Sequence, residues 1–396
     1  MAHYPVNEAS VPTAFSPRRP RRYNLIVSAS RRPSAFAWLA TAVIAALLLV
    51  SCNEDDPPAL LPTSADELVD RAFAMGISSL PSELTEESYA DTFELAAGAG
   101  EIVLIQRTPP WEELLAGTFS EETVLATQRE TALAEEHGLD IFVAIDPTDG
   151  SRQRDRLAGL PDDLLGAGFS DPLIHQALLD YARYLAETYQ PRYLAFGVEI
   201  NGYQQHHPED FERFVVIYHE AYEAVKEISP DTLVFPTFQF EELQGRLPFQ
   251  DPLPPQWYLI SRFEPRLDVL AISSYPDVVF PEADGIPDSY YQQLLLYTNR
   301  PVAIAGMGYS SRATEEIDSV EAEQAQAAFL RRTLDNAQQL NMPFVVWFIG
   351  QDPSFTGEST LDLAHSGLKR QDGTEKLAWR VWEQTSLRPL ASEPDS

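Results

Sequence analysis

The sequence predicts an α/β protein built as a single (β/α)8 TIM barrel, and three observations lead to this fold class. Eight short apolar runs alternate with amphipathic segments along the chain. No long linker rich in Pro, Gly or Ser divides that alternation. No G-x-G-x-x-G or G-x-x-x-x-G-K-[ST] motif is present, which disfavours an open, nucleotide-binding sheet. Strand and helix in regular alternation are the pattern of a closed parallel barrel.

The apolar runs are rich in Val, Ile and Phe, as is typical of strands buried on both faces of a parallel sheet. In chain order, the predicted strands span residues 72–77, 102–106, 141–145, 193–198, 233–238, 269–273, 302–305 and 344–348.

The segments between the strands carry the 3.6-residue periodicity of amphipathic helices. After the fourth strand, for example, Phe211, Phe214, Tyr218 and Val225 lie on one helical face. The other predicted helices span residues 86–97, 121–136, 172–188, 289–297, 320–340 and 375–384. The connection at 255–263 is rich in proline, and we expect it to be irregular.

Residues 1–51 are predicted to be an export signal. Arginine pairs precede an uncharged, largely apolar stretch over residues 35–50, which is the pattern of such signals. The stretch ends in Leu-Val-Ser-Cys, which resembles a bacterial lipobox, and Cys52 is the only cysteine. We therefore expect lipidation at Cys52 and an exported, membrane-anchored lipoprotein of the bacterial cell envelope. An uncleaved signal anchor is the alternative.

The remaining chain divides by composition into three parts. Residues 52–64 form a polar tether, residues 65–386 the barrel, and residues 387–396 a C-terminal tail. The single cysteine excludes an internal disulfide and a Cys-rich metal site.

The net charge of −32 is unfavourable for nucleic-acid binding, because such a surface repels phosphate. We expect neither a cofactor nor a metal. The pair His206-His207 does not change this, because adjacent side chains diverge and Pro208 follows as a helix start.

In a (β/α)8 barrel the functional residues follow the carboxyl ends of the strands. The polar residues found there are Asp146, Glu199, Asn201, Glu241 and Asp352. Carboxylates at such a rim bind hydroxyl groups or act as acid and base. For each of them, a loop cap or a structural role is the alternative.

Aromatic residues occupy the same rim: Trp111, Tyr203, Tyr275, Tyr309 and Trp347. Aromatic faces stack on the apolar faces of sugar rings, and ordinary barrel packing is the alternative for each. Together with the carboxylates they predict a carbohydrate cleft whose partner is a poly- or oligosaccharide.

Five segments in order resemble clan A of the glycoside hydrolases, which are retaining (β/α)8 enzymes. They are the Glu199 segment, Ser274-Tyr275-Pro276, Pro301 to Ser311, the strand at Trp347, and the ending Gly367-Leu368 … Lys376-Leu377-Ala378-Trp379. The endo-β-1,4-galactanase and related endoglycanase branches look closest. The resemblance implies that Glu199 is the general acid/base, that Tyr275 lies near the nucleophile and that Trp347 forms the floor of a sugar-binding subsite.

Two residues depart from the pattern of that clan. The asparagine that usually precedes the acid/base is Val198 here, and the nucleophilic glutamate after strand seven is replaced by Gly306. Retaining hydrolysis needs two carboxyl groups, so the resemblance implies that this mechanism is missing. We expect Gly306→Glu, alone or with Val198→Asn, to create or raise β-glycosidase activity.

Three functions remain open. The first is a glycoside-hydrolase-like lipoprotein that binds glycans and is non-catalytic or degenerate. The second is an active β-glycosidase or endoglycanase with Glu199 as acid/base and a relocated second carboxylate. The third is a structural or partner-binding surface barrel.

Overall fold

The computed structural model describes residues 69–150, 154–248, 253–280, 282–315, 317–355 and 363–391. The predicted export signal, the lipidation residue Cys52 and the tether all lie outside the described residues. Within the described residues, no helix has both the length and the apolar composition to cross a membrane.

In the described part of the chain, nine parallel strands form one sheet in the order β5-β4-β3-β2-β1-β9-β8-β7-β6. They are β1 (Ala74–Ser78), β2 (Ile102–Arg107), β3 (Asp140–Ile145), β4 (Tyr193–Phe196), β5 (Leu233–Phe235), β6 (Thr237–Gln239), β7 (Leu270–Ser274), β8 (Val302–Met307) and β9 (Phe344–Trp347). Each of the eight predicted apolar runs overlaps one of these strands or, in one case, two.

The sheet closes at Pro236, which separates β5 from β6. The first half of this segment pairs with β4 at Leu233 and the second half pairs with β7 at Thr237. Proline has no N–H to donate, so the strand is interrupted where it changes partner. Strands β5 and β6 are thus two halves of one barrel strand, and the predicted (β/α)8 fold is confirmed.

An aromatic cluster fills the barrel interior. The ring of Phe142 on β3 lies 5.6 Å from the rings of both Phe235 on β5 and Phe344 on β9. Tyr193 on β4 lies 4.4 Å from Phe344. These strands are not all neighbours, so the rings meet across the barrel. Each such pair adds about 0.5–1.5 kcal/mol beyond the burial of its area.

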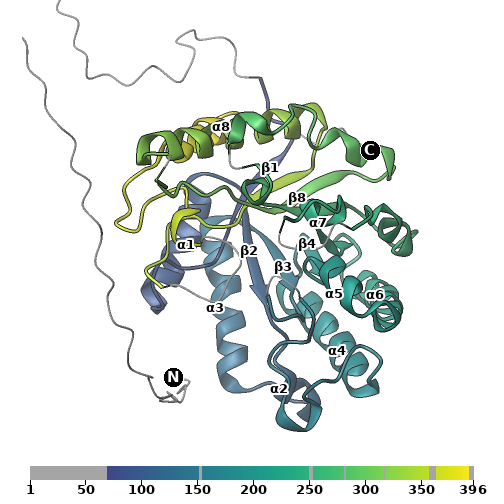
Figure 1. Cartoon of the computed structure of the whole chain (residues 1–396). Helices are drawn as coiled ribbons and strands as arrows, with labels where there is room; N and C mark the ends of the chain where they lie inside the picture. Colours follow the sequence, from purple (N-terminus) through teal and green to yellow (C-terminus); the bar gives the residue numbers. More distant parts are fainter. Residues whose placement is uncertain are drawn as a thin grey trace, which may run out of the picture. The chain divides into compact units, whose positions relative to one another are not determined.

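Helices surround the strands in Figure 1, with α1 and α3 to the left of β2, α4 and α6 to the right of β3, and α8 above them. The helices of the described residues are α1 (Glu86–Gly98), α2 (Trp111–Ala116), α3 (Glu121–His137), α4 (Pro172–Tyr189), α5 (Ile200–His206), α6 (Pro208–Ile228), α7 (Phe240–Leu243), α8 (Ser319–Gln339) and α9 (Leu377–Ser386). Side chains of Thr85, Ser120 and Asp318 cap helix starts by accepting backbone N–H groups.

The predicted helix over residues 289–297 is wrong. The segment contains a short 3-10 helix, Gln292–Leu296, preceded by two further 3-10 turns. Tyr290 and Tyr291 are both buried, and their hydroxyls reach Glu241 and Ser274. Two adjacent inward side chains break the helical periodicity. The irregular connection expected at 255–263 is confirmed, since it forms a 3-10 helix over Trp257–Arg262.

The two ends of the described barrel chain meet at the start of β1. Arg71 forms a parallel bridge with Leu390, and its N–H donates to the carbonyl of Pro389. The Arg71 side chain also pairs with Glu101 and donates to the carbonyl of Arg388. These contacts fix the end of the chain beside its entry, at the amino end of the barrel.

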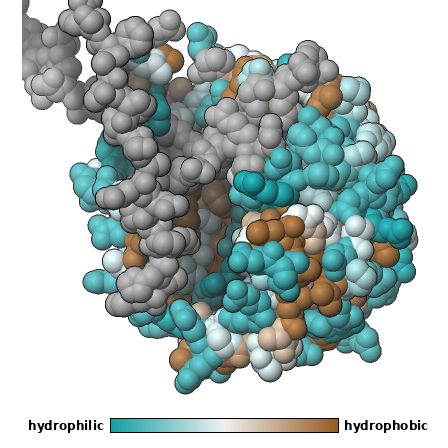
Figure 2. All heavy atoms as spheres, turned by 60° about the horizontal axis from the view of Figure 1, so that its bottom comes forward, coloured by the Kyte–Doolittle hydropathy of each residue, from teal (hydrophilic) through white to brown (hydrophobic). Residues whose placement is uncertain are grey.

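Figure 2 shows a face on which hydrophilic residues predominate, with a group of apolar residues among them. This agrees with the acidic composition of the chain.

Candidate functional site

Glu199 lies at the carboxyl end of β4, in a turn whose backbone requires a glycine at position 197. Gly197 has a φ of 95°, and a Cβ there would lie 2.5 Å from Cζ of Phe214. Glu199 itself has a φ of 49°, and its N–H donates to Oγ1 of Thr237 at 2.9 Å. The turn therefore places the Glu199 side chain at the opening formed by the carboxyl ends of the strands, hereafter the mouth.

A buried arginine contacts Glu199. Nε of Arg154 donates to Oε2 of Glu199 at 2.9 Å. Its Nη1 donates to both oxygens of Asp146, at 2.9 and 3.1 Å, and to Oγ1 of Thr148 at 2.8 Å. Burial lowers the pKa of Arg154, but the charges of Asp146 and Glu199 outweigh it, so the net direction is upward. Sequence reasoning identified both carboxylates but missed Arg154.

Arg154 reaches the mouth on the loop between β3 and α4. Thr148 and Leu157 form an antiparallel bridge across this loop. Nε1 of Trp111 donates to the carbonyl of Ala158 at 2.6 Å. Trp111 was predicted as a sugar platform, and the structure places it under this loop, almost fully buried.

Tyr275 lies over Gly306. A Cβ on Gly306 would be 3.3 Å from the Tyr275 hydroxyl and 3.8 Å from Cδ2 of Phe348. Burial raises the pKa of Tyr275, and the negative charge of Glu199 raises it further. Glu199, Tyr275 and Gly306 therefore belong to one site, and Gly306 contributes no side chain to it.

The aromatic residue at this point is Phe348 rather than the predicted Trp347. Successive side chains of a strand point to opposite faces. Trp347 is fully buried, packs at 6.2 Å from Phe329 on α8, and donates from Nε1 to the carbonyl of Ser366. Phe348 is partly exposed and contacts the Gly306 position. Phe348, one position beyond the end of β9, is thus the aromatic residue beside Gly306.

Glu241 is completely buried and accepts four hydrogen bonds. The donors are the Ser274 and Tyr290 hydroxyls, the Tyr275 N–H and the Gln239 amide, at 2.7–3.1 Å. Burial raises the pKa of Glu241, although these donors oppose the change. The carboxyl group thus holds α7, β7 and the Tyr290 segment together, and no part of it is open to a ligand.

Glu242 is a second residue that sequence reasoning missed. It is buried, and its Oε2 accepts a hydrogen bond from Nδ2 of Asn201 at 3.2 Å. A Cβ on Gly202 would lie 3.3 Å from both Oε2 of Glu242 and Cβ of Arg154. The Glu242 carboxylate and the Cβ of Arg154 therefore flank the same position on α5. Its position beside Glu241, after a strand end, was the available signal.

Three other side chains that were predicted to contact a ligand form hydrogen bonds within the protein instead. Asn201 accepts from the N–H of Gln239 and also donates to its carbonyl. Tyr203 is buried and donates to Asp210, and Tyr309 is buried and donates to the carbonyl of Phe280. None of these three side chains faces open solvent.

Asp352 forms a buried ion pair with Lys376, whose Nζ lies 2.7 Å from Oδ2. Burial raises the pKa of Asp352 and lowers that of Lys376, and each charge opposes the change in the other. Lys376 also donates to Oγ of Ser311 at 3.0 Å. The pair therefore joins the segments that follow β8 and β9.

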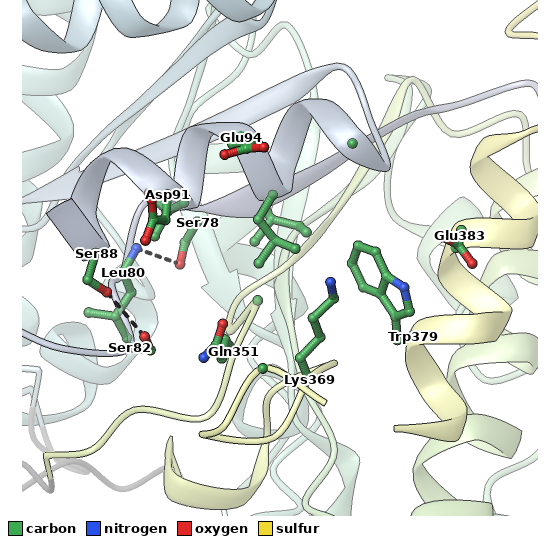
Figure 3. Close-up of a pocket in the computed structure, with 16 residues that line it drawn as sticks. Ser78, Leu80, Ser82, Ser88, Asp91, Glu94, Gln351, Lys369, Trp379 and Glu383 are labelled. Atoms are coloured by element: carbon green, nitrogen blue, oxygen red, sulfur yellow. Dashed lines mark hydrogen bonds between the residues drawn. The ribbon is translucent and has the colours of Figure 1, made fainter. Parts of the chain in front are cut away.

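A separate hollow of about 510 Å³ lies between α1 and α9. Figure 3 shows Asp91 and Glu94 of α1 on one side of it, and Lys369 and Trp379 on the other. The Lys369 ammonium lies 4.1 Å from the centre of the Trp379 ring. Glu199 and its partners do not line this hollow. Within the described ranges, no group of three or more His, Cys, Asp or Glu residues could hold a metal ion.

The fold and the mouth define a class of protein: a (β/α)8 barrel whose strand ends bring together carboxylates, an arginine and aromatic rings. No family model matches the sequence, and no curated protein sequence matches it either.

Solved structures of this class do resemble the chain. An exo-β-1,4-mannosidase from Opitutaceae bacterium strain TAV5 superposes with a TM-score of 0.61 at 15% identity, over 80% of this chain and 59% of that one. A variant of GH5_18 from Bifidobacterium longum, solved with Manβ1-4GlcNAc, superposes with a TM-score of 0.59 at 18% identity, over 82% of this chain and 81% of that one. Xylanase 10B from Thermotoga maritima superposes with a TM-score of 0.54 at 11% identity, over 80% of this chain and 95% of that one.

The chain thus spans 59% of the length of the mannosidase. At these identities the likeness is one of fold. It confirms that the chain has a glycoside-hydrolase-like barrel, as its resemblance to clan A implies.

Proposed function

We propose that this protein binds a glycan at the barrel mouth without hydrolysing it. The observation that carries the proposal is Gly306, which offers no carboxylate at the point where Tyr275 and Phe348 converge. A retaining glycosidase needs two carboxyl groups about 5–5.5 Å apart, and one of them must form a covalent intermediate. Glu199 supplies one group, and Gly306 cannot supply the other.

The mouth retains groups suited to holding a sugar. The partly exposed Phe348 ring offers an apolar face, and the Tyr275 hydroxyl lies beside it. The carboxylate of Glu199 is 15% exposed as a side chain and can accept hydrogen bonds from hydroxyls. Stacking combined with carboxylate–hydroxyl bonds is a common way to bind pyranose rings.

The ligand that we would test first follows from the similar structures. GH5_18 is solved with Manβ1-4GlcNAc, and another similar structure is an exo-β-1,4-mannosidase. We therefore propose a β-linked mannose- or GlcNAc-containing oligosaccharide as the glycan partner.

An active enzyme is the second candidate function. The observation that favours it is Glu242, a second carboxylate whose Oε2 and the Cβ of Arg154 flank the same position, Gly202 on α5. A second carboxylate about 6.5–9.5 Å from Glu199 would suit an inverting mechanism, in which water attacks directly.

The deciding experiment is to measure binding and product release together. The full chain is titrated with a β-glycan panel by calorimetry, and reducing-sugar release is followed on the same panel. Binding without release, weakened in Glu199→Gln, supports the proposal. Release that disappears in Glu199→Gln but persists in Glu383→Gln, an exposed control residue, supports the enzyme. If the chain shows no binding and no release, a structural or partner-binding barrel is supported.

Export and lipidation remain part of the proposal. Arginine pairs, the apolar stretch and Cys52 support them. Labelling with palmitate in a bacterial host tests them: incorporation into the full chain that is lost in Cys52→Ser is the expected result.

A further inference from the structure

Arg154 places a guanidinium between two carboxylates of the mouth. Its guanidinium joins two strand ends, since it bonds to Asp146 after β3 and to Glu199 after β4. Arg154 is 9% exposed, and the Glu199 side chain is 15% exposed. The pair is therefore shielded from water and salt, which makes it stronger than an ion pair on the surface.

Both members of the pair have left-handed backbone conformations. The φ of Arg154 is 46° and that of Glu199 is 49°. Residues other than glycine occupy this region at a cost of about 1–2 kcal/mol, and such residues concentrate at functional sites. The bridge between Thr148 and Leu157 joins the two arms of the loop that carries Arg154. The local backbone is thus built to bring the guanidinium to Glu199.

We propose that Arg154 is a positioning residue that holds Glu199 as a fixed, charged acceptor for a sugar hydroxyl and prevents it from acting as a proton donor. The choice of a sugar as the ligand rests on the proposed function, whereas the action of Arg154 on Glu199 does not. A general acid must carry a proton and present it to the leaving oxygen. A hydrogen bond from a buried guanidinium favours the charged form of a carboxyl group, and that form has no proton to donate.

The same arrangement leaves the opposite role open. A general base must be unprotonated when it activates water, and a charged Glu199 meets that condition. Arg154 would therefore block the step in which the glycosidic oxygen is protonated and spare the step in which water is deprotonated. This asymmetry distinguishes the proposal from a simple loss of the site.

The direct test follows the ionisation of Glu199 by ¹³C NMR of the full chain, with Glu199→Gln used to assign the signal. Besides Arg154, the titratable groups that the described residues bring to this region are Asp146 after β3, Tyr275 and Asp277 after β7, and Glu241 and Glu242 from α7. We expect Arg154→Met to move the Glu199 titration midpoint upward by about one pH unit or more, because a positive charge is lost.

Arg156→Met is the matched control. Arg156 lies on the same loop, is 76% exposed as a side chain and pairs with Asp149 rather than with Glu199. Its loss should leave the Glu199 midpoint unchanged. If Arg154→Met does not fold, Arg154→Lys retains the charge without the fork that spans Asp146 and Glu199, and a smaller upward movement is expected. A midpoint that stays the same in every folded variant at position 154 overturns the proposal.

Glycan binding provides the second readout. Arg154→Met should weaken binding by about tenfold, and the double variant Arg154→Met/Glu199→Gln should bind no more weakly than Glu199→Gln alone, because both changes remove the same acceptor. Fully additive losses overturn the positioning role. If the wild-type chain binds no glycan, the proposed function fails, and the NMR titration still decides the role of Arg154.

Discussion

Gly306→Glu tests whether the β8 end is a vacant nucleophile position. A Cβ there would lie 3.3 Å from the Tyr275 hydroxyl, 3.8 Å from Phe348 and 4.0 Å from Oγ of Ser273. The nearest atom is the end of a side chain, so a small shift of Tyr275 admits the new residue. We expect a loss of about 1–3 kcal/mol in unfolding free energy from the added volume. This corresponds to a decrease in Tm of roughly 2–10 °C.

The activity expected of Gly306→Glu depends on the leaving group. 4-Nitrophenol departs as a stable anion, so an aryl β-glycoside needs no proton from Glu199. We therefore expect Gly306→Glu to hydrolyse aryl β-glycosides and to leave oligosaccharides intact. Adding Arg154→Met should then raise oligosaccharide hydrolysis by about 100-fold, within the range that general acid catalysis contributes.

The assay follows 4-nitrophenolate absorbance and, separately, reducing ends released from β-linked oligosaccharides. Gly308→Ala, in which a Cβ would lie 3.4 Å from the Tyr275 ring, controls for crowding of Tyr275 without adding a carboxylate. The addition of Val198→Asn tests the second departure from the clan A pattern. A folded Gly306→Glu variant that binds the glycoside and hydrolyses no aryl substrate, with or without Val198→Asn, would refute the assignment of this position.

Three further predictions concern stability. Gly197→Ala should lower the unfolding free energy by more than 2 kcal/mol in urea unfolding, because its φ of 95° disfavours a side chain and the new Cβ would overlap Phe214 at 2.5 Å; an unchanged midpoint would contradict this. Lys376→Met should cost about 3–5 kcal/mol by leaving the buried Asp352 unpaired, and a loss below 1 kcal/mol would disprove it. Burial raises the pKa of Glu241 from its ordinary 4.5, so its contribution is complete below pH 4.5 and decreases as the pH rises through the raised pKa. Unfolding curves of Glu241→Gln should therefore differ most from the wild type at acid pH, by about 1–3 kcal/mol, and a difference that grows with pH would contradict this.

The sequence predicted the barrel well, because strands buried on both faces appear as apolar runs wherever they occur. It also located Glu199, since a residue after a strand end must reach the mouth. Trp347 shows the limit of predicting side-chain direction from sequence. It was expected at the mouth, but Phe348 lies there, because adjacent strand residues point to opposite faces. A run of apolar residues does not state which face each side chain occupies.

Arg154 could not be predicted for a different reason. Its contact with Glu199 joins two loops that are 45 residues apart in the chain, and it depends on a left-handed backbone at both residues. No periodicity encodes such a contact. Residues 289–297 were misassigned because their apolar spacing suits a helix, whereas Tyr290 and Tyr291 are drawn inward by Glu241 and Ser274.

The meeting of the chain ends at Arg71 has a mechanical consequence. Strand β1 begins beside Leu390, at the barrel end opposite the mouth. A pull applied ahead of residue 69 would reach the barrel at Arg71. There it would load the bonds to Pro389 and Arg388 and the ion pair with Glu101 before it strained β1. These bonds therefore carry such a load at the amino end of the barrel, far from Glu199 at the mouth.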